Sequence, residues 1–283
     1  MGVHLTMYNL VGWSAISRCW LKKYVKDFLR ENRVVIRKKL GQSFLVDCRV
    51  ARYVADFIEG GVVYEIGCGI GNLTFFLAEK AEYVLGVELD YRLAHYFRKK
   101  VGLENVDVIN SDAILLRFNG PFDYVVSNVP YYISSDIIVK LCKDIDFKIG
   151  ILTFQKEFAE RLYAIPGTSS YGRISVIASL CFTVKPLMTI GSSAFFPRPK
   201  VNSKILFIEK KNIEKEIIEG VEKLTQKIFS YRKRKLSFAL EKGLGLKKEE
   251  ICFLGDLINR RIFTLSPEEI LYIYKRLREK GLF

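Results

Sequence analysis

The chain has 283 residues, of which 49% are hydrophobic and 13% aromatic, enough for one large domain, or a large and a small one, with a sizeable core. Its formal net charge of +14 favours a polyanionic partner, either nucleic acid or an anionic membrane surface. No segment has the length and apolar character of a transmembrane helix, and the first 20 residues lack the basic start and cleavage site of a signal peptide. These features argue against integral membrane and secreted proteins.

Residues 1–36 have two interpretations. They are an N-terminal extension with a helix rich in Lys and Arg over 17–31, or they precede the true start of the protein. From residue 62 onward, short apolar runs alternate with helical patterns. Strands are predicted at 62–66, 83–87, 106–109, 122–127, 147–154 and 204–208, and helices at 72–80, 91–101 and 135–142. Such alternation predicts an α/β fold with a parallel sheet and helices on both faces.

The character of the chain changes after residue 209. Residues 210–283 show helical spacing and many charges, which predicts a small C-terminal helical domain. This segment contains the basic run RKRK at 232–235, which is either a contact for a nucleic-acid backbone or a solvated helix face. We therefore expect three parts, namely the extension 1–36, an α/β domain over 37–209 and the helical domain 210–283.

The six cysteines are scattered, at Cys19, Cys48, Cys68, Cys142, Cys181 and Cys252. None forms a C-x-x-C pair, and the two histidines, His4 and His95, are far apart, so no metal site is predicted. Scattered cysteines are typical of free, mostly buried thiols in a reducing compartment. We therefore expect a cytoplasmic protein whose cysteines are not paired.

A glycine-rich segment, EIGCGIG at 65–71, begins within the first strand and leads into a helical pattern. Glycines there allow a sharp turn and a close approach of the backbone to a ligand, although a tight strand-to-helix turn has the same appearance. Glu88 ends the second strand about twenty residues later, where an acid can accept hydrogen bonds from ribose hydroxyls or cap a helix. Asp112 follows the third strand and can accept from an adenine amino group or serve as a turn residue.

The ends of these three strands are expected to meet at the carboxyl edge of the sheet, where ligands bind in open α/β folds. The ligand must contain an adenosine. The spacing G-x-G-x-G lacks the third glycine of the dinucleotide-binding form, and it favours S-adenosylmethionine over NAD.

The sequence NVPYYISS at 128–135 follows the fourth strand. An exocyclic amine on a planar base is a poor nucleophile because its lone pair is delocalised into the ring. Two acceptors aimed at its N–H bonds, the Asn128 side-chain oxygen and the Val129 carbonyl, would free that lone pair. Pro130 fixes the local backbone, Tyr131 offers a ring for stacking, and Ser134 or Ser135 caps the next helix. The alternative is an ordinary strand-to-helix loop that contains a proline.

Seven blocks of this sequence, taken in order, resemble the KsgA-type ribosomal RNA adenine dimethyltransferase family. They are KKLGQSFL at 38–45, EIGCGIG at 65–71, VELD at 87–90, NVPYYISS at 128–135, QKEFAERL at 155–162, YGRISV at 171–176 and SAFFPRPKV at 193–201. The family patterns for the first and fourth blocks contain GQNFL and NLPYNIS. Ser43 and Val129 depart from those patterns, and the extension 1–36 has no counterpart.

The resemblance implies a Rossmann-like, S-adenosylmethionine-dependent methyltransferase that acts on N6 of two adjacent adenosines near the 3′ end of small-subunit rRNA during ribosome biogenesis. It implies that the methyl donor is held by Gln42, Ser43, Leu45, Gly67, Glu88, Asp112 and Asn128. It implies that the target adenine is held by Asn128, Val129, Pro130 and Tyr131, with Phe195 stacking on its other face.

The resemblance also implies that the helical domain grips the RNA backbone, and that a monomer acts on a pre-30S type of small ribosomal subunit without a metal or a membrane. Three alternatives remain at this point. They are a methylase of a large-subunit rRNA adenine, a non-catalytic RNA-binding or ribosome-assembly factor on the same fold, and a DNA adenine methylase.

Overall fold

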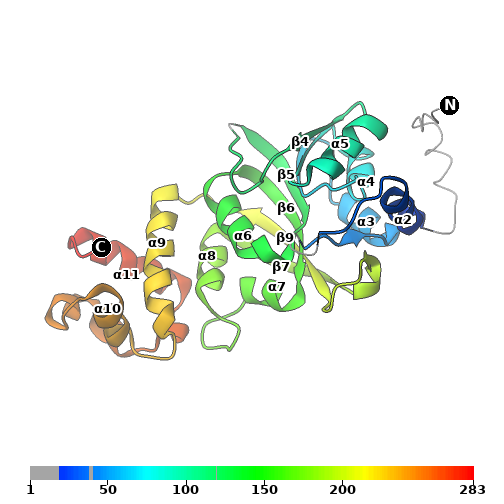
Figure 1. Ribbon diagram of the computed structural model, residues 1–283. Helices are drawn as coiled ribbons and strands as arrows, with labels where there is room; N and C mark the ends of the chain where they lie inside the picture. The colour runs from blue at the N-terminus through cyan, green and yellow to red at the C-terminus, as the bar shows by residue number, and fades with distance from the viewer. Residues whose placement is uncertain (1–18, 38–40, 119) are drawn as a thin grey trace. The chain divides into compact units, whose positions relative to one another are not determined.

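The computed structural model describes residues 19–37, 41–118 and 120–283, and Figure 1 traces their path. The predicted N-terminal helix is present as α2 (Leu21–Glu31), whereas the extension before residue 19 lies outside the described residues. The chain forms two compact units, each assembled from three segments. The first comprises Met1–Ile137, Ile145–Lys156 and Pro186–Ile208, as far as these residues are described, and the second Ile138–Asp144, Glu157–Lys185 and Glu209–Phe283.

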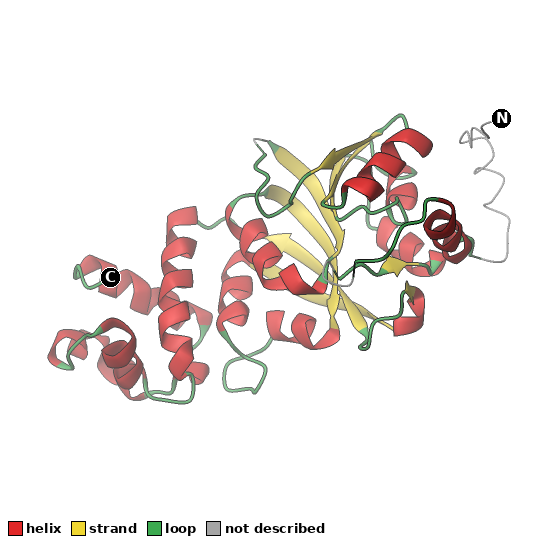
Figure 2. Cartoon of the chain, in the orientation of Figure 1, coloured by secondary structure: helices red, strands yellow, loops and turns green. Residues whose placement is uncertain are grey.

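A seven-stranded sheet organises the fold, with strand order β4-β3-β2-β5-β6-β9-β7. In that order the strands are Val106–Asn110, Tyr83–Glu88, Val62–Ile66, Pro121–Asn128, Asp146–Gln155, Ser203–Lys210 and Phe182–Ile190. The first five are parallel to their neighbours, and helices lie on both sides of the sheet (Figure 2). The chain runs outward from β2 to β4 and then resumes at β5 on the other side of β2. This reversal is the topological switch point at which α/β folds bind ligands.

Each of the six predicted strands is present, with bounds that differ by at most two residues at either end. Strand β7 was not predicted. Its sequence FTVKPLMTI contains Pro186, and four of its nine side chains are exposed. Proline is tolerated in a strand mainly at the edge of a sheet, and β7 is the last strand in the order. Its pattern therefore lacks the apolar run that marks a buried strand.

The core of the first unit lies between the sheet and helices α2, α3 (Cys48–Ala55) and α4 (Thr74–Ala78). Helix α2 buries Leu21, Val25 and Phe28, which follow the three- and four-residue spacing of one helix face. Helix α5 (Tyr91–Lys100) packs beside β3 and β4. A second, two-stranded sheet pairs β1 (Phe44–Leu45) with β8 (Phe195–Phe196) in antiparallel fashion. This pairing joins two sequence blocks that are about 150 residues apart.

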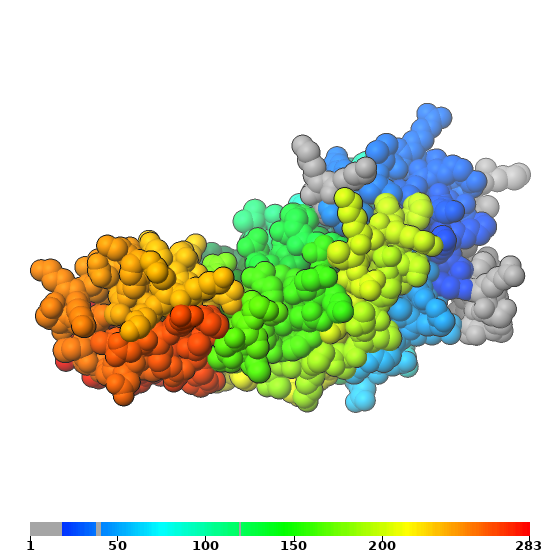
Figure 3. Space-filling model, turned by 90° about the horizontal axis from the view of Figure 1, so that it is seen from below, coloured from blue at the N-terminus to red at the C-terminus, as the bar shows by residue number. Residues whose placement is uncertain are grey.

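The second unit is mainly helical after residue 210. Helices α10 (Leu236–Leu244) and α11 (Pro267–Glu279) both pack on α9 (Lys215–Ile228), and this region forms the continuous yellow-to-red surface in Figure 3. The same unit contains most of α6 (Ser134–Lys143) and α7 (Lys156–Leu162), and all of α8 (Arg173–Cys181). Ser266 and Glu269 form a reciprocal capping box at the start of α11, with Pro267 in its first turn.

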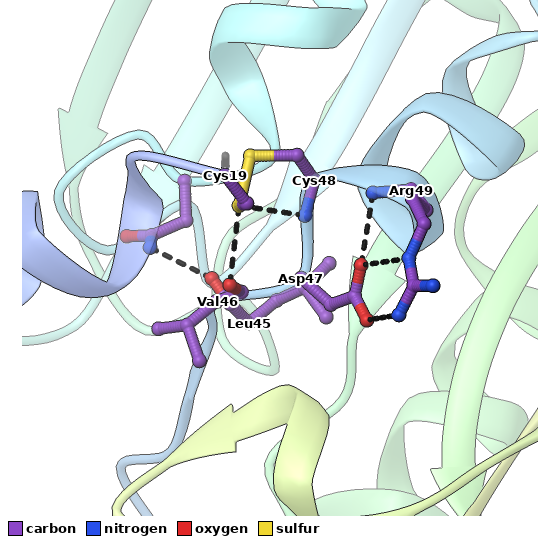
Figure 4. The surroundings of a disulfide bond; sticks show 7 residues. Cys19, Leu45, Val46, Asp47, Cys48 and Arg49 are labelled. Atoms are coloured by element: carbon purple, nitrogen blue, oxygen red, sulfur yellow. Dashed lines mark hydrogen bonds and ion pairs between the residues drawn. A yellow bond between two sulfur atoms is a disulfide. The ribbon is translucent and has the colours of Figure 1, made fainter. Parts of the chain in front are cut away.

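The prediction of unpaired cysteines is wrong for four of the six. Cys19 is bonded to Cys48 and Cys142 to Cys181, whereas Cys68 and Cys252 are free. Figure 4 shows Cys19, which precedes α2, joined to Cys48 at the start of α3. The partners are 29 and 39 residues apart, so their proximity arises from tertiary packing and not from any local motif. The premise that scattered cysteines remain free thiols in a reducing compartment therefore does not hold for these four residues.

In the part of the chain that the structure describes, no helix is both long and apolar enough to cross a bilayer. Within the same residues, no group of three or more His, Cys, Asp or Glu side chains is arranged to hold a metal ion.

Candidate active site

The carboxyl ends of β2, β3 and β5 open into one cavity of the first unit. Ten of the eleven residues predicted for the site line it, namely Gln42, Ser43, Leu45, Gly67, Glu88, Asp112, Asn128, Val129, Pro130 and Tyr131. The strand register explains this convergence, because Ile66 lies opposite Val87 on one side and Ser127 on the other. The residues that follow these positions therefore emerge at the same edge of the sheet.

The glycine-rich loop turns sharply under the cavity. Gly67, Gly69 and Gly71 all have positive φ angles, of 75°, 61° and 94°, which favour glycine. A Cβ on Gly71 would also lie 2.2 Å from the Phe97 ring, so this position excludes a side chain for two independent reasons. The Gly67 amide donates to the Val87 carbonyl at 2.7 Å, which fastens the loop to the end of β3.

Glu88 is buried at the end of β3 and braces the same loop. One carboxylate oxygen accepts from the Gly69 amide at 2.9 Å and the other from the Asp90 amide at 2.7 Å. Burial raises the pKa of Glu88, while these backbone donors act against that rise. The sequence also allowed Glu88 to cap helix α5. The cap is instead Asp90, whose carboxylate accepts from the Arg92 amide. A carboxylate can accept more bonds than these two, so Glu88 retains acceptor capacity toward the cavity.

Asp112 lies in the loop after β4, and one of its carboxylate oxygens accepts from the Ile114 amide at 2.8 Å. The turn role considered from the sequence is therefore real. It does not compete with ligand binding, because the carboxylate has a second oxygen.

Gln42 lines the cavity, but protein partners engage its amide. The side-chain nitrogen donates to the Asp90 carboxylate at 2.8 Å, and the oxygen accepts from the Arg37 amide at 2.7 Å. Hydrogen bonds from Arg92, with a further contribution from Gln42, lower the pKa of Asp90 to about 2, so this carboxylate is charged at all physiological pH values. Gln42 thus ties the 41–45 segment to the start of α5.

The side-chain nitrogen of Asn128 donates to the Ser43 carbonyl at 3.0 Å. This bond fixes the orientation of the amide, whose side-chain oxygen is the atom that can accept from a ligand. The Val129 amide is held by the Thr153 carbonyl at 3.0 Å, and Pro130 has φ −58° and ψ 125°. The backbone at the end of β5 is therefore fixed on both sides of the Val129 carbonyl.

The two residues after Val129 are also constrained. Tyr131 shares a hydrogen bond of 2.8 Å with the Ser203 hydroxyl. The predicted cap of α6 takes a different form, because the Ser134 hydroxyl donates to the Tyr131 carbonyl instead of accepting from a helix amide. The hydroxyl of Ser43 is directed to the Pro197 carbonyl at 2.8 Å. Asn128 is held by the backbone carbonyl of residue 43, which does not depend on the side chain there. The replacement of Asn by Ser at position 43 therefore leaves this contact intact.

Phe195 is not in the cavity wall. It lies in the hydrophobic core with 2% of its surface exposed, opposite Leu45 in the β1–β8 pair. Side chains alternate between the faces of a strand, so the partly exposed Phe196 points the other way. The stacking role inferred for Phe195 has no support in this arrangement.

The cavity wall also contains residues that were not predicted as site residues, and three of them are relevant to its chemistry. Glu65 and Asn72 line the wall, and each has a buried side-chain oxygen without a hydrogen-bond partner among the described residues. Burial raises the pKa of Glu65 to about 8, so this carboxyl carries a proton at neutral pH. Tyr132 also lines the cavity. Glu65 lies in the segment EIGCGIG and Tyr132 in NVPYYISS, and Asn72 directly follows the first of these. Their positions within or beside these motifs could have identified them as site residues.

A Rossmann-like sheet with a glycine loop at its switch point, followed by acids at the ends of the next two strands, defines a class I type of S-adenosylmethionine-dependent methyltransferase. The acceptors at the cavity fit this donor, which carries ribose hydroxyls, an adenine amine and two cationic centres. Similar proteins show which methyltransferase family this chain belongs to.

Residues 33–279 match the family model described as ribosomal RNA adenine dimethylase. A relative from Thermococcus gammatolerans, named "Probable ribosomal RNA small subunit methyltransferase A", is 39% identical over 90% of this chain and 92% of its own length. A solved dimethyladenosine transferase from Plasmodium falciparum superposes with a TM-score of 0.71 at 28% identity, covering 84% of this chain and 98% of that one. The 23S rRNA methyltransferase ErmE reaches a TM-score of 0.60 at 25% identity, covering 83% and 99%.

The chain belongs to the ribosomal RNA adenine dimethylase family. The predicted family, fold class, enzymatic class and methyl donor are confirmed by these matches.

Proposed function

We propose that this protein transfers methyl groups from S-adenosylmethionine to N6 of two adjacent adenosines near the 3′ end of small-subunit rRNA. The observation that carries the proposal is the orientation of Asn128, whose nitrogen is tied to the Ser43 carbonyl while its oxygen is left to accept. The small-subunit relative and the dimethyladenosine transferase support an adenine in that rRNA as the substrate.

The lining of the cavity supports the following roles for the donor-binding residues. Glu88 accepts from the ribose hydroxyls and Asp112 from the adenine amino group, because these carboxylates lie at the ends of adjacent strands. Gly67 and its neighbours allow close approach of the donor along the loop. Leu45 and Ser43 close the wall, and Gln42 holds their segment in place.

The target adenine enters beside Asn128. Its amino group donates one N–H to the Asn128 oxygen and the other to the Val129 carbonyl, which draws the nitrogen toward a tetrahedral geometry and exposes its lone pair. S-adenosylmethionine supplies a methyl group on a positively charged sulfur. As the N–CH₃ bond forms, the C–S bond breaks, and the amine proton is released to water. Tyr131 stacks on the base, and its hydroxyl is anchored by Ser203, so the ring is held ready for the base.

The helical part, residues 210–283, is proposed to hold the RNA backbone. In the second unit, residues 232–236 pair with 260–263 through backbone hydrogen bonds, among them Leu236 to Arg260 and Ile262 to Arg234. This pairing places Arg261 beside the basic run, opposite Lys235. Lys233, Arg234, Lys235 and Arg261 are all exposed, and we call them the basic ridge. Exposed cations grouped in this way suit phosphates.

Arg232 has a different task. Its guanidinium donates to the carbonyls of Thr168, Ser169 and Tyr171, at 3.2, 3.2 and 2.8 Å. It therefore fixes the loop before α8 and is not free for RNA.

The remaining parts of the proposal follow from the same activity. We infer that residues 37–209 form the methyltransferase domain and that a monomer acts in the cytoplasm on a pre-30S type of small subunit.

The test is to incubate the protein with S-adenosylmethionine and small ribosomal subunits that lack the modification, and to analyse the digested RNA by mass spectrometry. Dimethyladenosine that maps to the 3′-end helix is the expected result. Donor binding without dimethyladenosine would point to another RNA, and the absence of both would favour a non-catalytic assembly factor.

A further inference from the structure

Tyr132 is a cavity residue to which the proposed mechanism assigns no task. It lies in the short 3₁₀ helix η3 (Tyr131–Ile133) and lines the same cavity as Glu88 and Asp112. Half of its surface, 50%, is exposed. The neighbouring Tyr131 has a hydroxyl anchored by Ser203, whereas Tyr132 lines the cavity with half of its surface accessible.

The ring of Tyr132 connects two walls of the cavity. A Cβ built on Gly41 would lie 3.5 Å from Cδ1 of Tyr132, so the ring packs over the Gly41 backbone. Gly41 leads into Gln42 and Ser43, which belong to the donor-binding segment. The ring thus bridges from the loop after β5 to the segment that precedes β1.

Two carboxylates share the cavity wall with Tyr132. Asp112 and Glu88 line the same cavity as Tyr132, and burial, then the negative charges of these two carboxylates, raise the pKa of the Tyr132 hydroxyl. Glu88 and Asp112 are the acceptors proposed for the ribose and the adenine. The ring therefore shares the cavity wall with the acceptors proposed for adenosine, and its hydroxyl keeps its proton at neutral pH.

We propose that the ring of Tyr132 stacks on the adenine of the methyl donor and closes the adenosine end of the cavity. The inference rests on the proposed function for the roles of Glu88 and Asp112. The family pattern NLPYNIS has Asn at this position, so an aromatic ring here departs from that pattern. The tyrosine ring offers a large apolar face for stacking, which the amide of an asparagine lacks.

Stacking of an aromatic ring on a base has a distinct signature. The contact involves only adenosine, which the donor and its product S-adenosylhomocysteine share, so both must lose affinity by the same factor when the ring is removed. The proposed contact is to the adenosine part of the donor, so the loss must fall on donor affinity. The hydroxyl is not required, so Tyr132→Phe must retain the effect.

The experiment is calorimetry of S-adenosylmethionine and S-adenosylhomocysteine binding to the wild type, Tyr132→Ala, Tyr132→Asn and Tyr132→Phe. We expect Ala and Asn to weaken both ligands by about 5- to 30-fold, and Phe to remain within about twofold of the wild type. The matched control is Tyr91→Ala, because Tyr91 is an exposed aromatic residue outside the cavity wall. It should leave both affinities unchanged.

Steady-state kinetics with unmodified small subunits completes the test. An unchanged donor affinity in Tyr132→Ala would overturn the inference, and a raised KM for RNA in the same variant would assign the ring to the RNA. Unequal losses for donor and product would also contradict adenine stacking. Failure of the wild type itself to bind the donor would instead overturn the proposed function on which the inference rests.

Discussion

The side-chain nitrogen of Asn128 donates to the backbone carbonyl of Ser43 across 85 residues of sequence. An amide has one acceptor and one donor end, so this bond decides which end faces the target base. The catalytic geometry of the site therefore depends on a backbone atom of the 41–45 segment, and the identity of the side chain at position 43 is secondary.

Asn128→Ala should lower kcat for methyl transfer by about 100-fold or more, because it removes an acceptor that acts in the transition state. Donor affinity should fall by less than about tenfold, since the adenosine contacts remain. Ser43→Ala is the matched control, because it removes only the hydroxyl bonded to Pro197 and keeps the carbonyl. Single-turnover methylation and calorimetry provide the two readouts. Equal turnover in Asn128→Ala and the wild type would exclude the proposed role.

Replacing Lys233, Arg234 and Lys235 by Gln should weaken RNA binding and reduce the magnitude of the slope of log K against log salt by about 2. The matched control neutralises Arg98, Lys99 and Lys100, three exposed cations at the end of α5. Both variants lose the same net charge, so a difference between them reports the place of contact. If both lower the slope equally, the basic ridge has no special role.

Arg232→Ala should destabilise the protein by roughly 2–4 kcal/mol, because three carbonyls of the 168–171 loop lose a charged donor. Lys233→Ala, at the neighbouring exposed position, should change the free energy of unfolding by less than about 0.5 kcal/mol. Urea unfolding followed by circular dichroism measures both. A similar small effect for the two variants would show that the Arg232 contacts contribute little.

The stability of the protein should depend on Glu65 between pH 5 and 8. Burial raises its pKa from 4.5 to about 8, so across this range the folded state binds more protons at this group than the unfolded state does. Its contribution to the free energy of unfolding therefore falls as pH rises. Glu65→Gln removes this titration, and the variant should gain stability relative to the wild type as pH rises from 5 to 8. A constant difference across this range would contradict the assignment.

Thiol titration of the denatured protein under non-reducing conditions should find two reactive thiols, those of Cys68 and Cys252. Cys19→Ser should destabilise the protein by about 2–4 kcal/mol because it opens the link between α2 and α3. Reducing agent should lower the stability of the wild type, and Cys252→Ser is the control that leaves both bridges intact. Six reactive thiols in the untreated protein would show that the cysteines are unpaired in solution.

Much of the fold and of the donor site was predictable because the signals are local. A buried parallel strand reads as a short apolar run, so β2, β3, β4, β5 and β6 were found close to their true bounds. Parallel strands end at one edge, so a motif at each strand end predicted one cavity. Strand β7 was missed because an edge strand tolerates polar residues and proline.

The sequence by itself determined which chemical groups the strand ends carry, because strand, glycine-loop and proline signals depend on neighbouring residues. Only the tertiary structure decided which distant groups meet. It joined Cys19 to Cys48, directed the nitrogen of Asn128 to Ser43, turned Phe195 into the core and used Arg232 inside its own unit. These outcomes depend on the path of the chain between the partners, and no local pattern of residues specifies that path.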